Sequence, residues 1–474
     1  MSPQLHLPME LIRMICEASD QSTLASLSRV SKALHTVVED YLWINYEWDG
    51  SSRVVKYLQR IIEKPGLASL VKHVNIHLPG ELEYDEVLES NIVEPLDVPK
   101  SAIPSLIASS PAVQDNWKKE IEASDPSAFL ALVIALLPNL VSIRVHTRAL
   151  QELDNLCDFF DWVSRPEYKE ARMSSVHGGH DPAFPHLREV YITSTDRASV
   201  EPGWERTNHA MDLLPLFYLP SLEHITAPIH LQDNFSWGRP TQPNAENIKS
   251  LDISMIREAN LARVLAATPL LEKLDWNWCS RLDMDPLYPV PIADKHINLQ
   301  RLSVLLGKLS ETLTHLKITG SIRRLATEDG RFEGMFTKLV DDGNLGIFTP
   351  LTKLQTFHVP LSFVLGLHDP HKSDPLVLAR NLPSNVEYLT ISDEKPDPDD
   401  AHWLPEEIIL VVKAYLSCWK EWTPKLVSLK LEIGSKGADL VAEELADVVA
   451  SSGIQFQIEA NPFPWDLSDS TDES

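Results

Sequence analysis

The sequence predicts an α/β protein in which a short module of three helices precedes a long solenoid with a parallel sheet. Two observations support this fold class. The first forty or so residues place apolar side chains at helical spacing, whereas the chain from Leu67 onward repeats a short phrase ending in period-two alternation. We therefore expect a helical module in residues 1–47, a solenoid with loop insertions in residues 48–465, and an acidic, disordered tail in residues 466–474.

The first helix is predicted to begin at Pro8, because the missing N–H of proline suits the first helical position. Leu11, Ile12 and Ile15 follow at helical spacing and form an apolar stripe. Cys16 falls on the apolar side of this helix, so we expect it to be buried as a small hydrophobic residue.

A second helix follows, with Asp20 or Ser22 as its cap and with Leu24, Leu27 and Val30 along it. A third is predicted from Ser31 through Leu42, and its inner side carries Leu34, Val37, Val38 and Tyr41. Three short helices are near the lower size limit for independent folding. We expect them to leave Leu7, Pro8 and Leu11 partly exposed, which would require a partner surface.

The apolar positions of this module follow a recognisable order. A Leu7-Pro8 pair comes first, Val30-Ser31-Lys32 follows, and Leu42-Trp43 closes the segment. This order resembles an F-box, and the resemblance implies docking on a Skp-family adaptor and through it on a cullin ubiquitin ligase. The residues expected to form or support the adaptor contact are Leu7, Pro8, Leu11, Ile15, Leu24, Leu27 and Val30.

The second part of the chain repeats one phrase, in which a turn residue precedes two leucines or their apolar equivalents and a stretch of alternation. Each copy predicts a short strand entered through a tight loop. The copies are LASLVKHVNI (67–76), PNLVSIRV (138–145), PHLREVYI (185–192), PSLEHITA (220–227), NIKSLDIS (247–254), PLLEKLDW (269–276), NLQRLSVL (298–305), TLTHLKIT (312–319), LTKLQTFHV (351–359), SNVEYLTI (384–391) and PKLVSLKL (424–431).

Segments of helical period lie between these phrases, including Phe129 to Leu137, Leu261 to Leu265 and Ile408 to Trp419. One strand and one helix per unit is the plan of a leucine-rich repeat. The copies are unevenly spaced and degenerate, and they resemble the irregular repeats found behind F-boxes in fungal proteins. This resemblance implies a horseshoe with a parallel sheet on its concave side.

Longer stretches without periodicity interrupt the repeats and are expected to be loops, on which substrate-binding residues would lie. The sequence does not identify those residues. The stretches are Gly80 to Pro126, Pro166 to Pro185, Ser194 to Trp204, Asn234 to Asn244 and Asp393 to Asp400.

Composition narrows the classes of partner and the compartment. The chain has 42 Lys and Arg against 68 Asp and Glu, for a formal charge of −26. We expect it to bind neither nucleic acid nor membrane, and we expect any protein held by its charge to be basic. Without a signal peptide, a run of about 20 apolar residues or paired cysteine spacing, an intracellular protein of the cytoplasm or nucleus is expected. The four cysteines are Cys16, Cys157, Cys279 and Cys418.

No catalytic site or cofactor is predicted. His177 and His180 flank two glycines and are expected in a solvated loop rather than at a metal. Adjacent carboxylates such as Glu406 and Glu407 have no apparent acid–base partner. Trp276 and Trp278 are two apart on one strand face, where core packing is expected more than a ligand platform.

The sequence therefore predicts a non-catalytic substrate-recognition subunit of a Skp–cullin–F-box ubiquitin ligase. The helices would dock on the adaptor and the solenoid would hold a protein substrate. The alternative is a repeat scaffold whose N-terminal helices only cap the solenoid.

Overall fold

A computed structural model describes sixteen segments of the chain, and all structural statements below refer to them. They are residues 7–48, 53–77, 119–121, 126–147, 153–165, 184–194, 213–229, 235–254, 256, 258–277, 296–319, 338–340, 348–365, 374, 376–393 and 403–461. Most of the predicted loop insertions, the His177/His180 pair, Cys279, Trp278 and the acidic tail lie outside these residues.

The N-terminal module forms the three predicted helices: α1 (Met9–Glu17), α2 (Gln21–Val30) and α3 (Lys32–Leu42). Asp20 caps α2 by accepting a hydrogen bond from the N–H of Thr23 at 2.7 Å, and Ser31 caps α3. The core of the module is small and consists of buried Cys16, Leu24 and Val38. The half-buried side chains that pack against it are Ile12, Leu27, Tyr41 and Leu42.

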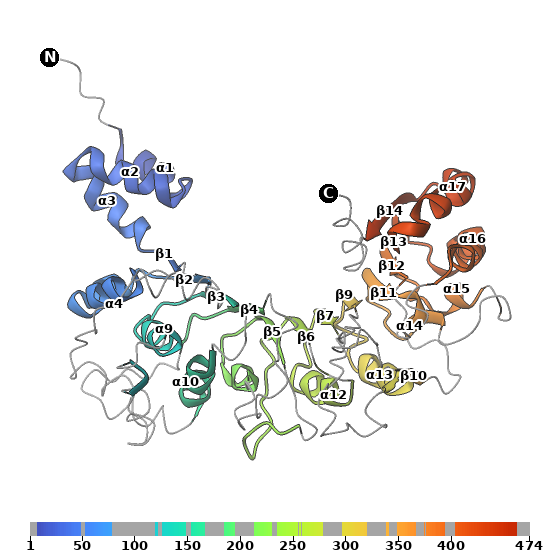
Figure 1. Cartoon of the computed structure of the whole chain (residues 1–474), viewed down its shortest axis with the longest axis horizontal. Coiled ribbons are helices and arrows are strands. Elements are labelled where there is room, and N and C mark those ends of the chain that lie inside the picture. The colour runs from blue at the N-terminus through green and yellow to red at the C-terminus, as the bar shows by residue number, and fades with distance from the viewer. Residues whose placement is uncertain are drawn as a thin grey trace, which may run out of the picture. The chain divides into compact units, whose positions relative to one another are not determined.

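The chain divides into two compact units. Unit 1 contains residues 1–199 and 211–227, and unit 2 contains residues 200–210 and 228–474. In unit 1, α3 leads directly into the first strand (Figure 1). Its strands, each pairing in parallel with the next, are β1 (Asn45–Trp48), β2 (His73–His77), β3 (Ser142–Thr147), β4 (Glu189–Ser194) and β5 (His224–Pro228).

Unit 2 continues the same plan, again with parallel pairing between successive strands. They are β6 (Ser250–Ser254), β7 (Lys273–Asn277), β9 (His315–Thr319), β11 (Thr356–Pro360), β12 (Tyr388–Ser392), β13 (Ser428–Gly434) and β14 (Gln455–Asn461). A separate two-stranded sheet pairs β8 (His296–Asn298) with β10 (Lys338–Val340).

One backbone contact recurs at the start of the repeats and explains how they stack. In unit 1 the N–H groups of Val141 and Ser142 both point to the carbonyl oxygen of Lys72, at 2.7 and 3.1 Å. In unit 2 the N–H groups of Thr314 and His315 meet the carbonyl of Glu272 in the same way. In both units this contact joins the start of one strand to the start of the strand beside it, which keeps the two strands in register.

The alternation of the phrases corresponds to alternating burial. In β13, Leu429, Leu431 and Ile433 are buried, while Lys430 and Glu432 between them are half-exposed. The leucines aligned with Leu429 through the register of unit 2 are also buried: Leu251, Leu274, Leu316 and Leu389. The predicted repeat core of short parallel strands is therefore confirmed for unit 2.

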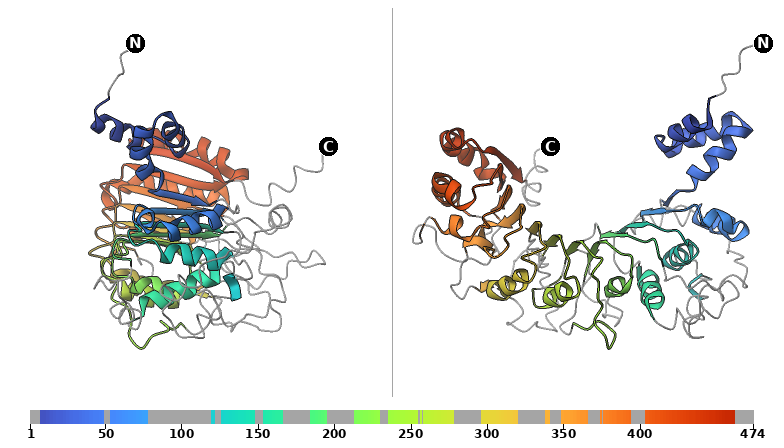
Figure 2. Two further views of the ribbon diagram at one scale, coloured as in Figure 1. Left: turned by 90° about the vertical axis from the view of Figure 1, so that its left-hand side faces the viewer. Right: turned by 180° about the vertical axis from the view of Figure 1, so that it is seen from behind.

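Helices cover one face of the strands in each unit (Figures 1 and 2). Those of unit 1 are α4 (Arg53–Glu63), α5 (Pro65–Ala68), α9 (Pro126–Ala135), α10 (Asp154–Ser164) and the 3₁₀ helix η2 (Leu214–Tyr218). Those of unit 2 are α12 (Glu258–Ala267), α13 (Leu299–Gly307), α14 (Leu361–Leu365), α15 (Val377–Asn381), α16 (Pro405–Trp422) and α17 (Ser435–Ser452). The predicted helical segments Leu261 to Leu265 and Ile408 to Trp419 lie within α12 and α16, and the segment Phe129 to Leu137 is helical as far as Ala135, the last residue of α9.

The phrase NLQRLSVL was predicted as a strand, and this prediction is wrong. Residues 299–307 form α13, which Asn298 caps by accepting a hydrogen bond from the N–H of Arg301 at 2.8 Å. Leu299, Leu302 and Leu306 are buried at intervals of three and four residues, which is helical spacing. The other ten phrases each contain or begin a strand.

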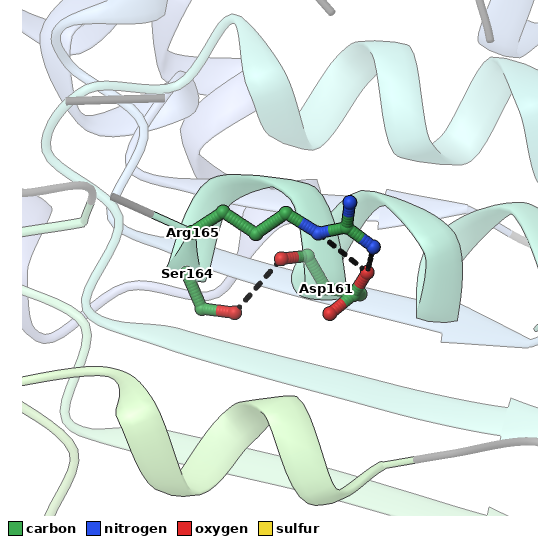
Figure 3. Close-up of polar contacts among 3 residues, drawn as sticks. All are labelled: Asp161, Ser164 and Arg165. Carbon is green, nitrogen blue, oxygen red and sulfur yellow. Dashed lines mark hydrogen bonds and ion pairs between the residues drawn. The ribbon is translucent and has the colours of Figure 1, made fainter. Parts of the chain in front are cut away.

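The last turn of α10 shows how a helix of unit 1 ends. The guanidinium of Arg165 donates from Nε to Asp161 Oδ2 at 2.9 Å and makes a second, ionic contact with the same oxygen (Figure 3). The hydroxyl of Ser164 donates to the carbonyl oxygen of Asp161 at 3.0 Å. The Ser164 contact occupies one of the backbone carbonyl groups that the end of a helix leaves without an intrahelical partner, and the Arg165 contact pairs two charged side chains of the same turn.

Candidate protein-interaction surfaces

Helix α1 has apolar side chains on two of its sides. One side, with Ile12 and Cys16, packs into the core of the module. The other carries Leu11, Met14 and Ile15, which are spaced by three and four residues and are 44%, 62% and 42% exposed. We call these three residues the α1 stripe. A helix that is apolar beyond the face that its own core covers has surface available for a partner.

Exposed apolar side chains are concentrated at this end of the chain. Of the thirteen large apolar side chains exposed among the described residues, six lie between Leu7 and Val30. They are Leu7, Met9, Leu11, Met14, Ile15 and Val30. The others are distributed over the much longer remainder, which makes the module the most prominent apolar surface of the described chain.

The seven residues predicted for the adaptor contact separate into two groups. Leu7, Pro8, Leu11, Ile15 and Val30 are exposed. Leu24 is buried and Leu27 is half-buried against the core, so both can support a contact only through the fold of the module. Sequence reasoning missed Met9 and Met14, although Met14 follows Leu11 at the interval of three that could have identified it.

The junction between the module and the first strand is closely packed. The side-chain Nε2 of Gln21 donates to the carbonyl oxygens of Leu42 at 3.3 Å and Asn45 at 3.0 Å. The ring of Tyr57 stacks on Trp43 at 5.2 Å and on Tyr46 at 3.7 Å, measured between ring centroids. Burial raises the pKa of the Tyr57 hydroxyl, which keeps it protonated at neutral pH.

The strand face opposite the helices, here called the open face, carries histidines in unit 1. The ring of His77 stacks on that of His146 at 4.7 Å, and His146 Nδ1 lies 2.8 Å from the hydroxyl of Thr193. Beside them the guanidinium of Arg144 lies 4.8 Å from the ring centre of Tyr191. Burial and then the neighbouring His77 lower the pKa of His146, so the imidazole of His146 is uncharged near neutral pH.

The open face of unit 2 carries a row of paired charges. Lys430 donates to Glu432 at 2.8 Å and also pairs with Glu459 on β14. His358 Nε2 lies 3.5 Å from Glu432 Oε2. Burial lowers the pKa of His358 to about 4 although Glu432 opposes the shift, so the imidazole is neutral at physiological pH. Because the positive charge of Lys430 is paired with the negative charges of Glu432 and Glu459, this face is suited to contact with a polar surface of another protein.

Glu407, Trp276 and three of the cysteines, whose side chains could in principle carry chemistry, lie within the described residues. The carboxylate of Glu407 caps α16 by accepting the N–H of Leu404 at 2.8 Å, which is a structural role. Trp276 is buried, and its indole N–H donates to the carbonyl oxygen of Ile256 at 2.9 Å. Core packing of Trp276 is thus confirmed. Cys16, Cys157 and Cys418 are free thiols.

Within the described segments, no group of three or more His, Cys, Asp or Glu side chains could hold a metal ion. No helix in the same segments has the length and apolar character needed to cross a bilayer.

No protein-family model matches the chain, and no curated protein matches it.

Proposed function

We propose that this chain is a substrate-recognition subunit of a Skp–cullin–F-box ubiquitin ligase. The helical module docks on a Skp-family adaptor, and through it on a cullin, while the repeats hold a protein substrate. The chain itself carries out no reaction. It raises the effective concentration of substrate lysines near the conjugating enzyme that the other subunits position.

The observation that carries this proposal is the α1 stripe. Three large apolar side chains stay exposed on one side of a nine-residue helix whose other apolar side already packs into a core. Water-exposed leucine, methionine and isoleucine at helical spacing favour a contact with a helical partner, because their burial is the available gain in free energy. A helix that packs apolar residues on a partner is what F-box docking requires.

The alternative, a cap for the repeats, predicts a different arrangement. A cap would direct its apolar face toward the end of the sheet. In the structure the core of the module draws all its residues from α1, α2 and α3. The connection to β1 is made by Gln21 and by the aromatic stack on Tyr57 instead of by the α1 stripe. This arrangement favours docking over capping.

The substrate arm is proposed to use the open faces of the strands together with neighbouring loops. Histidine, arginine and tyrosine in unit 1 and paired lysine and glutamate in unit 2 present hydrogen-bonding groups across many strands. Such a surface suits a protein segment better than a small molecule, which binds in a concave, mostly apolar pocket. The charge of −26 favours a substrate with basic residues.

The adaptor arm is tested by replacing Leu11 with aspartate in the full chain. Docking would bury an unpaired carboxylate, so we expect adaptor affinity to fall roughly 100-fold or more. The matched control is Leu440→Asp on α17, since Leu440 is 41% exposed, close to the 44% of Leu11. Adaptor captured equally by wild type and Leu11→Asp, with both chains folded by circular dichroism, would reject the docking proposal.

The substrate arm is tested separately by affinity purification with mass spectrometry. Wild type and Leu11→Asp are compared under the same conditions. Proteins lost with the variant report the adaptor arm, and proteins retained by both report the repeats. An adaptor retained by both chains supports the capping alternative, and the absence of any retained protein counts against substrate binding by the repeats.

A further inference from the structure

The last strand of unit 2, β14, has an unpaired edge. It pairs in parallel with β13 over all seven of its residues, and within the described part of the chain no strand pairs with its other side. The strand is reached through Gly453, whose φ of 76° ends α17 in the left-handed region. A seven-residue edge with free N–H and C=O groups is a template for pairing with another chain.

The apolar row of the sheet is also incomplete at this edge. Phe456 and Ile458 align in register with Leu429 and Leu431 of β13. The two leucines are buried, whereas Phe456 and Ile458 are only half-buried. Another strand beside β14 would cover them, as β14 covers β13.

The direction of the backbone groups determines which residues can bond outward. Gln455 donates its N–H to the carbonyl oxygen of Val427, next to β13, at 3.0 Å. Backbone groups alternate between the two sides of a strand, so Gln457 and Glu459 also face β13. Phe456, Ile458 and Ala460 therefore turn their N–H and C=O groups to the free edge.

We propose that β14 pairs with the β14 of a second copy of the chain, antiparallel and about a two-fold axis at Ile458. The sequence QFQIEAN is self-complementary in this register. Ile458 meets its own copy, and Phe456 meets Ala460, so a large side chain faces a small one in the apolar row. On the open face Gln457 meets Glu459, and at the ends Gln455 meets Asn461. An isologous contact of this kind closes as a dimer.

The alternatives in register are less favourable. Outward backbone groups bond only to outward groups, so the axis must pass through a residue and not between two. An axis at Glu459 would oppose two carboxylates across the interface. An axis at Gln457 leaves Asn461 outside the paired segment. The axis at Ile458 uses all seven residues and opposes no like charges.

The test measures the dimer dissociation constant of the full chain by analytical ultracentrifugation over a range of protein concentrations. Gln457 is exposed, and Lys430 beside it is already paired with Glu432 and Glu459. In the proposed dimer, position 457 of each copy meets Glu459 of the other copy, so every substitution there acts twice. Gln457→Glu creates two pairs of like charges across the interface, and Gln457→Lys creates two pairs of opposite charges. We expect the dissociation constant to rise about tenfold in the first and to fall about tenfold in the second.

A second pair of variants tests the backbone. Proline at position 460 removes an outward N–H and leaves the bonds to β13 in place, which an edge strand tolerates. We expect Ala460→Pro to be monomeric and Ala460→Val, which keeps the N–H, to dimerise. A wild-type chain that stays monomeric at every concentration overturns the proposal. So does a dimer that both Gln457 variants leave unchanged, because the contact would then lie elsewhere.

Discussion

Helix α1 and strand β13 both carry several large apolar residues, but those of β13 are buried and most of those of α1 are exposed. In β13, Leu429, Leu431 and Ile433 are all buried. In α1 only Cys16 is fully buried, and the α1 stripe of Leu11, Met14 and Ile15 stays exposed. Periodicity alone does not separate the two cases, because it reports that a face is apolar and not what covers it.

The difference follows from what lies beside each element. Strand β13 has β12 and β14 on its edges and helices on one face, so the repeat completes its own core. Helix α1 belongs to a module of three short helices, which cannot cover more than one side of each. An apolar face in excess of the available cover is therefore the feature that indicates a partner.

The largest effect is expected when leucine is replaced by alanine in β13 and, for comparison, in α1. Leu429→Ala opens a cavity in the core of unit 2 and should lower the free energy of unfolding by about 2–5 kcal/mol. Leu11→Ala removes an exposed side chain and should change it by less than about 0.5 kcal/mol, yet weaken adaptor capture. Urea unfolding followed by circular dichroism measures both. Equal midpoint shifts would show that the contrast between α1 and β13 is not real.

The sequence predicts the repeats well because each one repeats a local signal. Leucine, isoleucine or valine ahead of an alternating run identified ten strands, and Leu429 and its aligned leucines were assigned correctly to the core. The prediction failed where that signal was absent or ambiguous. Strand β1 has only four residues, Asn45–Trp48, and contains no leucine. The leucines of α13 fit the period of a strand as well as that of a helix, and the cap that Asn298 provides favours the helix.

For the candidate site, the sequence predicted the three helices of the module but could not separate surface from core. Leu24 and Leu11 look alike in the pattern, and only packing shows that Leu24 faces Cys16 and Val38 while Leu11 faces solvent. The open-face histidines could not be found from the sequence. His77 and His146 are far apart along the chain and meet only because β2 and β3 are neighbours in register.

The strands of unit 2 bury a titratable side chain as well as apolar ones, because they largely cover His358. The pKa of His358 is lowered to about 4 from 6.5, mainly by burial, while Glu432 opposes the shift and Lys317 and Lys430 add to it. Above pH 6.5 the imidazole is neutral in the folded and unfolded states. As the pH falls toward 4, the unfolded chain binds a proton that the folded chain excludes, so stability is lost, by at most about 3 kcal/mol.

The measurement is the urea midpoint of wild type and His358→Gln between pH 7 and pH 4. The variant cannot bind the proton, so its midpoint should fall less over this range. If both chains lose stability in parallel, the acid sensitivity of unit 2 does not come from His358.

The smallest effect compares the two regions through their helix caps. Ser31 Oγ accepts the N–H of Leu34 at 3.2 Å in the module, and Asn298 Oδ1 accepts the N–H of Arg301 at 2.8 Å in unit 2. Replacing either with alanine should cost about 1 kcal/mol. In Ser31→Ala we expect faster amide hydrogen exchange throughout α1–α3, because the buried core of the module is only three residues. In Asn298→Ala the faster exchange should stay within the first turn of α13, because the buried leucines of α13 hold the rest of the helix in place.

The control variants Asn298→Ser and Ser31→Asn keep a capping oxygen and should restore slow exchange. Exchange confined to the cap in both alanine variants would mean that the module is as well supported as the repeats, and would weaken the argument that its apolar surface needs a partner.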